Sequence, residues 1–541
     1  MTEVKNADEA ASIVLEQAML AADQGTFSVG GAIICNATGK VIKVMHNNVL
    51  KPLKNGKTFT YDPTAHGERQ LVYWYYENKD KDKLPEPSEL TIVTTLDPCV
   101  MCTGALLAAG FNVGVVAIDD FAGINYDSKF TFDDLPEKLC QVAKSKFGYY
   151  ACGKDGEPST YRRNYMGSDT VVFKNTEVSA ERLMGCDAIF KASVETVRKN
   201  SSNSGLDPGK LSDPAKLPDD SPIKKKYQEI YSDAFKVKVP PRLPNTQLLN
   251  VLQRVKNAKS GAKNAVALLD TFGNVVLCLA DSFDESPVHT AFMNVTQFYA
   301  TTRFELMNNE DKKIQEDAEQ YLTHPKYGTF VFLYAPNPSD ATTLMTLGAY
   351  GSTMEGPIPQ VFPANFQYYY PPQDGSSIEE LRSVMMKLPP FYTSTAQISA
   401  MEVGSTNSES MPIPIYLYKA ENPPRYHYTT NPTDTPGQDW TKAGIAFFAF
   451  QQHTVGATAV HQFSAGSPQR YGFDTSSLPA PAWTNDNKDA FYVLTSASNN
   501  SVPVYQYHQI LPGGLWNMFY SLDPNVKGWI NDGITFHVLG G

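Results

Sequence analysis

The sequence predicts a multidomain protein in which two α/β/α domains, the second lacking metal ligands, precede an all-β domain with pseudo-threefold repetition. Three observations support this fold class. Residues 1–199 alternate strand-like and helix-like patterns, which indicates an α/β sandwich. The opening hairpin pattern of that region recurs after residue 264, and three similar units follow residue 406. At 541 residues the chain is also too long for a single hydrophobic core.

The first domain begins with elements that can be read in order. Residues 8–24 place apolar side chains at helical spacing and end near Gly25. Two apolar runs, 27–35 and 39–44, flank an Asn-Ala-Thr-Gly turn and predict a β-hairpin. The following patterns predict a helix over 66–78, a buried strand over 90–94, a helix over 99–109 and a strand over 112–118.

Chemically demanding residues gather in two motifs, Asp-Pro-Thr-Ala-His-Gly-Glu at 62–68 and Asp-Pro-Cys-Val-Met-Cys at 97–102. His66, Cys99 and Cys102 offer one imidazole and two thiolates, the number of protein ligands that a catalytic Zn²⁺ takes when its fourth position stays open. Glu68 follows His66 by two residues and is predicted to be the catalytic proton shuttle rather than a ligand. The predicted cofactor is therefore Zn²⁺.

Two other interpretations of these residues remain open. A structural zinc site needs a fourth protein ligand, and a redox Cys-x-x-Cys pair is expected after a buried strand in a thioredoxin-like pattern. Neither interpretation gives Glu68 a purpose. Pro98 suits the position just ahead of a helix start, where unpaired backbone N–H groups favour thiolates. The catalytic interpretation explains more of the pattern.

His-x-Glu followed by Pro-Cys-x-x-Cys is the signature of zinc-dependent nucleobase deaminases, and the first ~150 residues resemble the cytidine-deaminase superfamily. The stretch Cys-Val-Met-Cys-Thr-Gly-Ala at 99–105 resembles cytosine deaminase. Asn47-Asn48-Val49, followed by Asp-Pro-Thr-Ala-His at 62–66, resembles guanine deaminase, and bacterial tRNA adenosine deaminase is similar to a lesser degree. The two parts of the site resemble enzymes with different substrates.

The resemblance implies hydrolytic deamination of an amino-substituted heterocycle such as a free nucleobase. It also implies that Asn47 binds the substrate, or Asn48 if the alignment is shifted by one residue. Backbone groups near Ala65 and Pro98 are implied to bind the substrate as well. By itself an Asn pair after a strand is more typical of turn chemistry. The far wall of the pocket is implied to come from 121–198, where the pattern is weakest.

The middle of the chain predicts a linker and a second domain. Residues 200–224 are rich in Ser, Asn, Asp, Pro and Gly and predict a linker. Residues 225–405 predict a degenerate deaminase-like domain that takes the place of a second subunit, forming an intrachain pseudo-dimer. The expected replacements are Ala291 for Glu68, Ser339 for Cys99 and Thr342 for Cys102, with His289 as an isolated histidine. Hydroxyl groups are poor zinc ligands beside thiolates.

The predicted last domain, 406–541, repeats three times, with units starting near residues 415, 460 and 504. Each unit contains one of the tryptophans Trp440, Trp483 and Trp529 and closes on an apolar strand. Short strands with Pro and Gly turns favour a β-trefoil. The tryptophans are interpreted first as core positions. The alternative is glycan binding, as is supposed for the aromatic-rich repeat module that this region resembles.

The composition of the chain favours some classes of binding partner over others. The formal charge of −11 argues against nucleic acid, which binds through phosphate neutralisation, and favours a small heterocyclic substrate. No stretch is long and apolar enough for a membrane span, and all seven cysteines precede residue 280, so a cytoplasmic protein without a disulfide framework is expected. A tRNA or nucleic-acid deaminase of adenosine or cytidine and a carbohydrate-binding protein remain as alternatives. Further homo-oligomerisation stays open.

Overall fold

The computed structural model describes most of the chain. The described residues are 2–119, 122–125, 131–152, 166–199, 204–239, 242–352, 364–389, 398–400, 412–431, 435–450, 457–476, 483–495, 501–512 and 514–539. The chain divides into two compact units, Met1–Val403 and Gly404–Gly541. No helix in the described part of the chain combines the length and the apolar character needed to cross a membrane.

The first half of the larger unit is a mixed sheet between helices. Its strands lie in the order β2-β1-β5-β6-β7-β9, with β1 antiparallel to β2 and β5, while β5, β6 and β7 run parallel. Its helices and strands are α1 (Ala7–Gln24), β1 (Gly30–Cys35), β2 (Val41–His46), β3 (Leu50–Pro52), β4 (Thr58–Thr60), α2 (Gly67–Asp82), β5 (Leu90–Leu96), α3 (Val100–Ala109), β6 (Asn112–Ala117), α4 (Glu137–Lys146), β7 (Phe147–Tyr149), β8 (Ala151–Cys152), β9 (Met166–Gly167), β10 (Glu177–Val178) and α5 (Ala180–Lys199).

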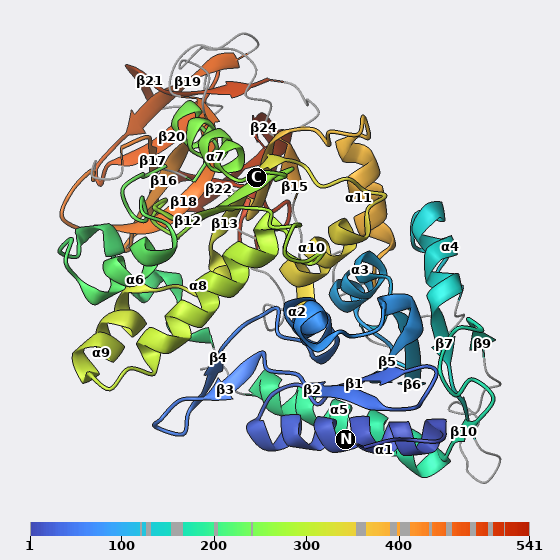
Figure 1. The fold of residues 1–541 in the computed structure, drawn as a ribbon. Coiled ribbons are helices and arrows are strands. Elements are labelled where there is room, and N and C mark those ends of the chain that lie inside the picture. The colour runs from blue at the N-terminus through green and yellow to red at the C-terminus, as the bar shows by residue number, and fades with distance from the viewer. Residues whose placement is uncertain are drawn as a thin grey trace. The chain divides into compact units, whose positions relative to one another are not determined.

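Local chemistry explains why these elements begin and end where they do. The side chain of Asn6 accepts a hydrogen bond from Glu9 N and caps α1, which ends at Gly25 in the left-handed conformation. Every residue of β5 is buried, as expected for a central strand covered on both faces. Helices α1 and α5 cover one face of the sheet, and α2 and α3 lie on the other (Figure 1). The predicted α/β sandwich is confirmed for this half.

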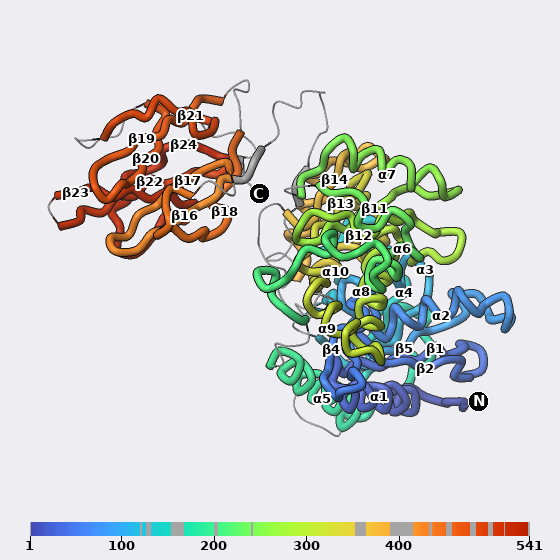
Figure 2. Tube along the Cα trace, turned by 90° about the vertical axis from the view of Figure 1, so that its left-hand side faces the viewer, coloured from blue at the N-terminus to red at the C-terminus, as the bar shows by residue number. Residues whose placement is uncertain are grey.

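The second half of the larger unit has the same topology. Its sheet order, β12-β11-β13-β14-β15, repeats the order β2-β1-β5-β6-β7, with an antiparallel hairpin followed by parallel strands. Figure 2 shows β12, β11, β13 and β14 side by side. The elements are α6 (Pro222–Ile230), α7 (Thr246–Ala258), β11 (Ala265–Leu269), β12 (Val275–Ala280), α8 (Ala291–Met307), α9 (Lys312–Tyr321), β13 (Thr329–Tyr334), α10 (Ala341–Ser352), β14 (Phe366–Tyr370), α11 (Ile378–Lys387) and β15 (Ile398–Ala400).

The segment predicted as a linker is anchored in the structure, apart from 200–203, which lie outside the described residues. Two short 3₁₀ helices, Pro208–Lys210 and Pro214–Lys216, follow Ser204. Asp213 accepts hydrogen bonds from Lys238 Nζ at 2.6 Å and from Asn274 Nδ2 at 2.8 Å. Composition alone predicted a linker, but hydrogen bonds of this kind hold the backbone of the described residues in place.

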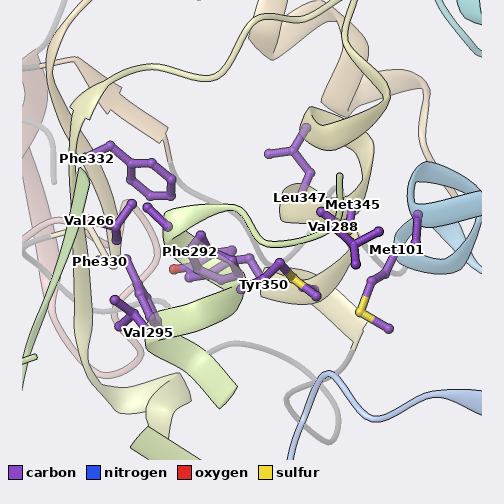
Figure 3. Packing of buried hydrophobic residues seen from close by; sticks show 14 of the residues in the cluster. Met101, Val266, Val288, Phe292, Val295, Phe330, Phe332, Met345, Leu347 and Tyr350 are labelled. Carbon is purple, nitrogen blue, oxygen red and sulfur yellow. The ribbon is translucent and has the colours of Figure 1, made fainter. Parts of the chain in front are cut away.

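The two halves meet where α3 packs against α10, and their buried residues form one continuous hydrophobic core. The contact is close because each helix presents a glycine. A Cβ atom on Gly104 would lie 2.3 Å from Met345 N, and a Cβ atom on Gly348 would lie 2.2 Å from Met101 N. Figure 3 shows Met101 of α3 and Met345 of α10 at this contact. The contacts are reciprocal, so the two helices are related by an approximate twofold axis.

The smaller unit consists of antiparallel strands in three similar groups. Each group has a central strand flanked by two others: β17-β16-β18, β20-β19-β21 and β23-β22-β24. The strands are β16 (Pro412–Ala420), β17 (Arg425–Thr429), β18 (Trp440–Phe450), β19 (Ala457–Ala465), β20 (Arg470–Asp474), β21 (Thr484–Leu494), β22 (Ser501–Leu511), β23 (Leu515–Ser521) and β24 (Ile530–Leu539).

Aromatic rings fill the centre of this unit at equivalent positions of the three groups. The stacked pairs are Tyr428–Phe447, Phe473–Phe491 and Tyr520–Phe536, with ring centroids 5.8, 6.0 and 6.2 Å apart. Trp440 belongs to this core, whereas Trp483 and Trp529 are only partly buried. The all-β fold with threefold repetition is observed, but the described residues of each group form three strands, and the β-trefoil is not confirmed. Glycan binding stays a prediction.

Candidate metal centre and active site

Three metal-binding side chains converge at the starts of two helices. His66 is the N-cap residue of α2, Cys99 is the N-cap residue of α3, and Cys102 lies in the first turn of α3. The sulfur atoms of Cys99 and Cys102 each lie 3.5 Å from His66 Nδ1. Ligand atoms placed about 2.0–2.3 Å from a tetrahedral zinc ion are roughly 3.5 Å apart, so the spacing suits that ion. The three could hold a metal ion.

Glu68 lies beside this cluster and is 2% exposed. Its Oε2 is 3.5 Å from the sulfur of Cys102, and its Oε1 accepts a hydrogen bond of 2.9 Å from Thr94 Oγ1. The sequence reasoning did not select Thr94. Thr94 is one of three threonines in the fully buried and otherwise aliphatic strand β5. Because buried hydroxyl groups need a partner, these threonines are the signal that could have pointed to it.

The electrostatics of the cluster favour a bound cation. Burial raises the pKa of Glu68 and also raises the pKa of the Cys102 thiol well above its ordinary value. The hydrogen bond from Cys102, assisted by His66, holds the pKa of Cys99 well below its ordinary value. Several acids within hydrogen-bonding distance in a buried site cannot all ionise unless a positive charge joins them. The donor set and its spacing therefore fit Zn²⁺.

The structure distinguishes the two asparagines that follow β2. Asn47 is fully buried, and its Oδ1 accepts hydrogen bonds from Thr26 Oγ1 and Val49 N. Its Nδ2 has no partner among the described residues, although it is buried. Asn48 is engaged on both sides, since it donates to His46 O and Gln70 Oε1 and accepts from Gln24 Nε2. A buried donor without a partner is the group that a ligand acceptor would satisfy.

The backbone groups near Ala65 and Pro98 already have partners. Ala65 O accepts hydrogen bonds from Asn48 N and Gln70 Nε2. Pro98 O accepts from Ile124 N at 2.9 Å and from Thr103 Oγ1 at 3.3 Å. A carbonyl oxygen has two lone pairs, so neither oxygen has one to spare. A substrate contact at these two positions stays a prediction.

Part of the weakly patterned region 121–198 reaches the second motif. Asp97 Oδ1 accepts a 2.6 Å hydrogen bond from Tyr149 OH, and Asp97 Oδ2 accepts one of 2.9 Å from Asn125 N. Gly123 pairs with Cys99 in an isolated bridge, and a Cβ atom there would lie 2.8 Å from Asp97 Oδ2. Residues 120–121, 126–130 and 153–165 lie outside the described residues. The described part holds the loop that carries Cys99.

The second half of the unit also contacts α2 next to the cluster. Arg69 follows Glu68, is 1% exposed, and lies 3.8 Å from Asp62. Its Nη2 donates a 2.8 Å hydrogen bond to Gln297 of α8. The ring of Tyr73 lies 4.6 Å from the ring of His289. Side chains from the second half therefore support the helix that carries Glu68.

Reciprocal packing of α3 and α10 gives the register between the two halves and corrects the expected replacements. Gly104 matches Gly348 and Met101 matches Met345, and both pairs differ by 244 positions (348 − 104 and 345 − 101). The same offset matches Cys99 with Thr343 and Cys102 with Thr346. The prediction of Ser339 and Thr342 at these positions was wrong, because α10 begins after an insertion relative to α3.

The remaining positions follow from the helix start and the strand register. Thr290 is the N-cap residue of α8, as His66 is of α2, so Phe292 rather than Ala291 matches Glu68. Thr94 pairs with Gly31 of β1, and Phe332 pairs with Val266 at the matching place of β11, so Phe332 matches Thr94. None of the matched residues in the second half is a strong zinc ligand.

A partly buried centre with one imidazole and two sulfur atoms, with a buried carboxylate alongside, has the residues of a metal-binding deaminase-like site. Residues 4–118 match the family model described as the cytidine and deoxycytidylate deaminase zinc-binding region. This part of the chain is similar to the cytidine-deaminase superfamily, and the match ends well before the second half begins.

Solved structures of deaminases are also similar to this chain. One, from a study of A-to-I editing by tRNA:A34 deaminases, is 22% identical, covers 22% of this chain and 82% of its own, and has a TM-score of 0.17. A guanine deaminase from Nitrosomonas europaea is 16% identical, covers 36% of this chain and 86% of its own, and has a TM-score of 0.23. With TM-scores this low, we rest the assignment on the family match and on the geometry of the site.

Proposed function

We propose that the first half of the larger unit is a zinc-dependent hydrolytic deaminase of an amino-substituted heterocycle such as a free nucleobase. The observation that carries this proposal is the convergence of His66, Cys99 and Cys102 beside the buried carboxylate of Glu68. A structural zinc site would need a fourth protein ligand. No other His, Cys, Asp or Glu joins the three-residue cluster among the described residues.

The reaction replaces an exocyclic amino group by oxygen, so that water enters and ammonia leaves. His66, Cys99 and Cys102 would hold a zinc ion, which would supply activation of water near neutral pH. Glu68 takes a proton from the water and delivers protons to the ring nitrogen and to the departing amino group. The hydrogen bond from Thr94 holds one carboxylate oxygen of Glu68, and the other lies 3.5 Å from the sulfur of Cys102.

Asn47 is proposed to orient the substrate. Its buried Nδ2 has no partner in the described part of the chain, and a ring nitrogen or carbonyl oxygen of a heterocycle would satisfy that donor. Asn48 is proposed to support the loop, because both ends of its amide are already hydrogen bonded.

The direct test replaces Glu68 by Gln in the full chain. The substitution keeps the size of the side chain and the contact with Thr94 while removing the proton carrier. We expect metal analysis to find zinc in both proteins and ammonia release to fall by about a hundredfold or more in Glu68→Gln, since positioned acid–base groups contribute roughly 10²–10⁴-fold. The screen covers cytosine, guanine, adenine, their nucleosides and pterins.

A second measurement removes the metal from the wild-type chain. Dialysis against a strong chelator should abolish ammonia release, and added Zn²⁺ should restore it. Near-normal turnover by Glu68→Gln, or full activity of the chelated protein, would refute the assignment of roles.

The second half is proposed to be a degenerate copy of the first that takes the place of a second subunit. Its matching topology and the reciprocal helix contact support this. The contacts of Gln297 with Arg69 and of His289 with Tyr73 give this copy a supporting role beside the catalytic helix.

Deamination of a base within nucleic acid is the competing function. The formal charge of −11 is unfavourable for a polyanion, whereas a small neutral ring requires no phosphate neutralisation. Adding short single-stranded RNA and a tRNA to the ammonia screen decides between the two. Turnover of RNA with none of the free bases would favour the nucleic-acid function.

A further inference from the structure

The second half contains a cavity of about 340 Å³ that the proposed reaction does not use. Its volume lies in the range of roughly 300–1,000 Å³ that small-molecule sites occupy. Six of its lining residues match the six residues that build the first site. These are Asp281, Thr290, Phe292, Phe332, Thr343 and Thr346, the counterparts of Asn47, His66, Glu68, Thr94, Cys99 and Cys102. Asp281 matches Asn47 because each directly follows the strand that pairs with the central hairpin strand, with His46 opposite Gly30 and Ala280 opposite Ala265.

The substitutions remove metal binding and proton transfer without closing the cavity. Threonines replace all three metal ligands, and a hydroxyl group does not compete with thiolate or imidazole for zinc. The hydrogen-bonded pair of Glu68 and Thr94 becomes a pair of phenyl rings. Phe292 and Phe332 are stacked, with ring centroids 5.8 Å apart and planes 11° from parallel. The cavity therefore lies at the same place in the fold as the first site, but it lacks the metal-binding side chains and the proton carrier.

The lining of the cavity suits a flat ring that carries N–H donors. Phe283 and Tyr334 add aromatic faces to those of the stacked phenyl rings. Among the charged lining residues, three aspartates stand against one lysine, Lys263, so the lining has a formal charge of −2. Carboxylates accept hydrogen bonds and repel anions, which favours amino groups over phosphates.

Two of these carboxylates are fixed in position. Asp281 is 4% exposed and accepts hydrogen bonds from Lys263 N, Asn264 N and Ala291 N, the first residue of α8. A carboxylate offers about four acceptor positions, so one remains. Asp340 is exposed at the start of α10, where its Oδ1 accepts a hydrogen bond from Thr342 N. Acceptors held in place before binding lose little entropy when a ligand arrives.

We propose that this cavity is a non-catalytic binding site for an amino-substituted aromatic heterocycle, a purine or pyrimidine base or nucleoside. The ring lies against the aromatic side chains and its amino groups donate to the carboxylates. The proposal does not depend on the activity of the first half, because no lining residue takes part in that site.

Calorimetric titration of the full chain with adenine, guanine, cytosine and their nucleosides tests the proposal. The Glu68→Gln protein serves as the reference, since it would not convert the ligand. Asp340→Asn keeps the hydrogen bond to Thr342 N but removes the charge. We expect it to weaken one class of binding sites about tenfold, because a hydrogen bond to a charged acceptor is stronger than one to a neutral acceptor. Nucleoside monophosphates should bind more weakly than the bases.

Asp311→Asn is the matched control, because Asp311 is equally exposed and caps α9 through Lys313 N in the same way. It should leave binding unchanged. Thr346→Phe fills the cavity and should abolish binding of bases to it. If Thr346→Phe does not fold, the comparison of Asp340→Asn with Asp311→Asn still tests the proposal. Base binding that is equal in Asp340→Asn and Asp311→Asn would overturn the proposal, as would the absence of any base binding at millimolar concentration. Failure of the proposed function would appear separately, as wild-type protein that binds bases but releases no ammonia.

Discussion

Thr94 shows how one hydrogen bond can fix the direction of the carboxylate that we propose to be catalytic. Its hydroxyl donates to Glu68 Oε1 at 2.9 Å inside the fully buried strand β5. Thr94→Val keeps the shape of the side chain and removes the donor. Because a hydrogen bond to a charged group contributes about 1.5–3 kcal/mol, we expect kcat to fall roughly tenfold to a hundredfold. Metal content should stay at the wild-type value, and an unchanged kcat would contradict the role.

The two asparagines after β2 should separate binding from stability. Asn47→Ala removes the buried donor that has no partner in the described residues, so we expect KM for the substrate to rise about tenfold. Asn48→Ala removes contacts with Gln24 and Gln70 and should lower the thermal midpoint with little effect on KM. Steady-state kinetics and thermal unfolding of both variants check the pair. The opposite pattern would assign the substrate contact to Asn48.

Asp270 gives the protein a pH-dependent contribution to stability. Burial raises its pKa to about 6, whereas an aspartate in an unfolded chain has a pKa of about 3.9. Between these values the folded protein keeps a proton that the unfolded chain has released. The contribution of Asp270 to the free energy of unfolding is therefore most favourable below about pH 4 and is lost as the pH rises to about 6.

Asp270→Asn removes this titration and serves as the reference. Over that pH interval the wild type should lose about 2–3 kcal/mol of unfolding free energy relative to Asp270→Asn, since each pKa unit corresponds to about 1.4 kcal/mol. Urea denaturation at several pH values measures the difference. A difference that does not vary with pH would show that Asp270 titrates normally.

At the scale of elements, the contact between α3 and α10 controls how closely the two halves approach. A methyl group on Gly104 or Gly348 would collide with backbone atoms, which cannot move aside as a flexible side chain can. Gly104→Ala and Gly348→Ala should each destabilise the protein by about 1–3 kcal/mol or more, as overpacking does. Because Cys102 lies on α3, we also expect weaker zinc binding in both variants.

Gly209→Ala is the control, since a Cβ atom at that position meets no atom within 4 Å. Its thermal midpoint and zinc content should equal those of the wild type. Midpoints that are equal for Gly348→Ala and Gly209→Ala would show that the helices can separate at little cost.

The first site could be predicted from the sequence more completely than its counterpart in the second half. The convergence of His66, Cys99 and Cys102 beside Glu68 was predictable because zinc chemistry demands particular residue types at a fixed spacing. The matching positions in the second half were not. Between the ends of β5 and β13 the offset is 238 (334 − 96), but across α3 and α10 it is 244, so six extra residues precede the matching turn. Serine and threonine have no comparable spacing rule. The sequence pattern therefore placed the counterparts of Cys99 and Cys102 about one helical turn too early in the chain.

At the scale of the whole molecule, the hydrophobic core does not end at residue 199. It continues through α3 into α8 and α10 (Figure 3). A fragment of residues 1–199 would expose the apolar face of α3, and exposed patches of this kind promote association. We expect the fragment to aggregate or form dimers in light scattering and to release ammonia much more slowly than the full chain. A monomeric, stable and fully active fragment would contradict the proposed role of the second half.

The overall architecture was predictable where apolar residues recur at regular spacing. It was not predictable where a segment is held only by contacts with residues distant in sequence. The α/β topology of the first half followed from alternating apolar runs, and the threefold repetition followed from spacing. The anchoring of Asp213 against Lys238 and Asn274 could not be read from a stretch of Ser, Asp and Pro, because it depends on residues distant in sequence.

The reciprocal glycine contact lies between two halves of a single polypeptide. Two separate chains joined by such a contact would part on dilution and could exchange with other copies. Here the tether keeps the effective concentration of one half around the other constant, whatever the amount of protein in solution. The first half is therefore always paired with the second half in a ratio of one to one. If the first half is the proposed deaminase, its turnover per molecule should not change down to the lowest protein concentration that the assay can measure.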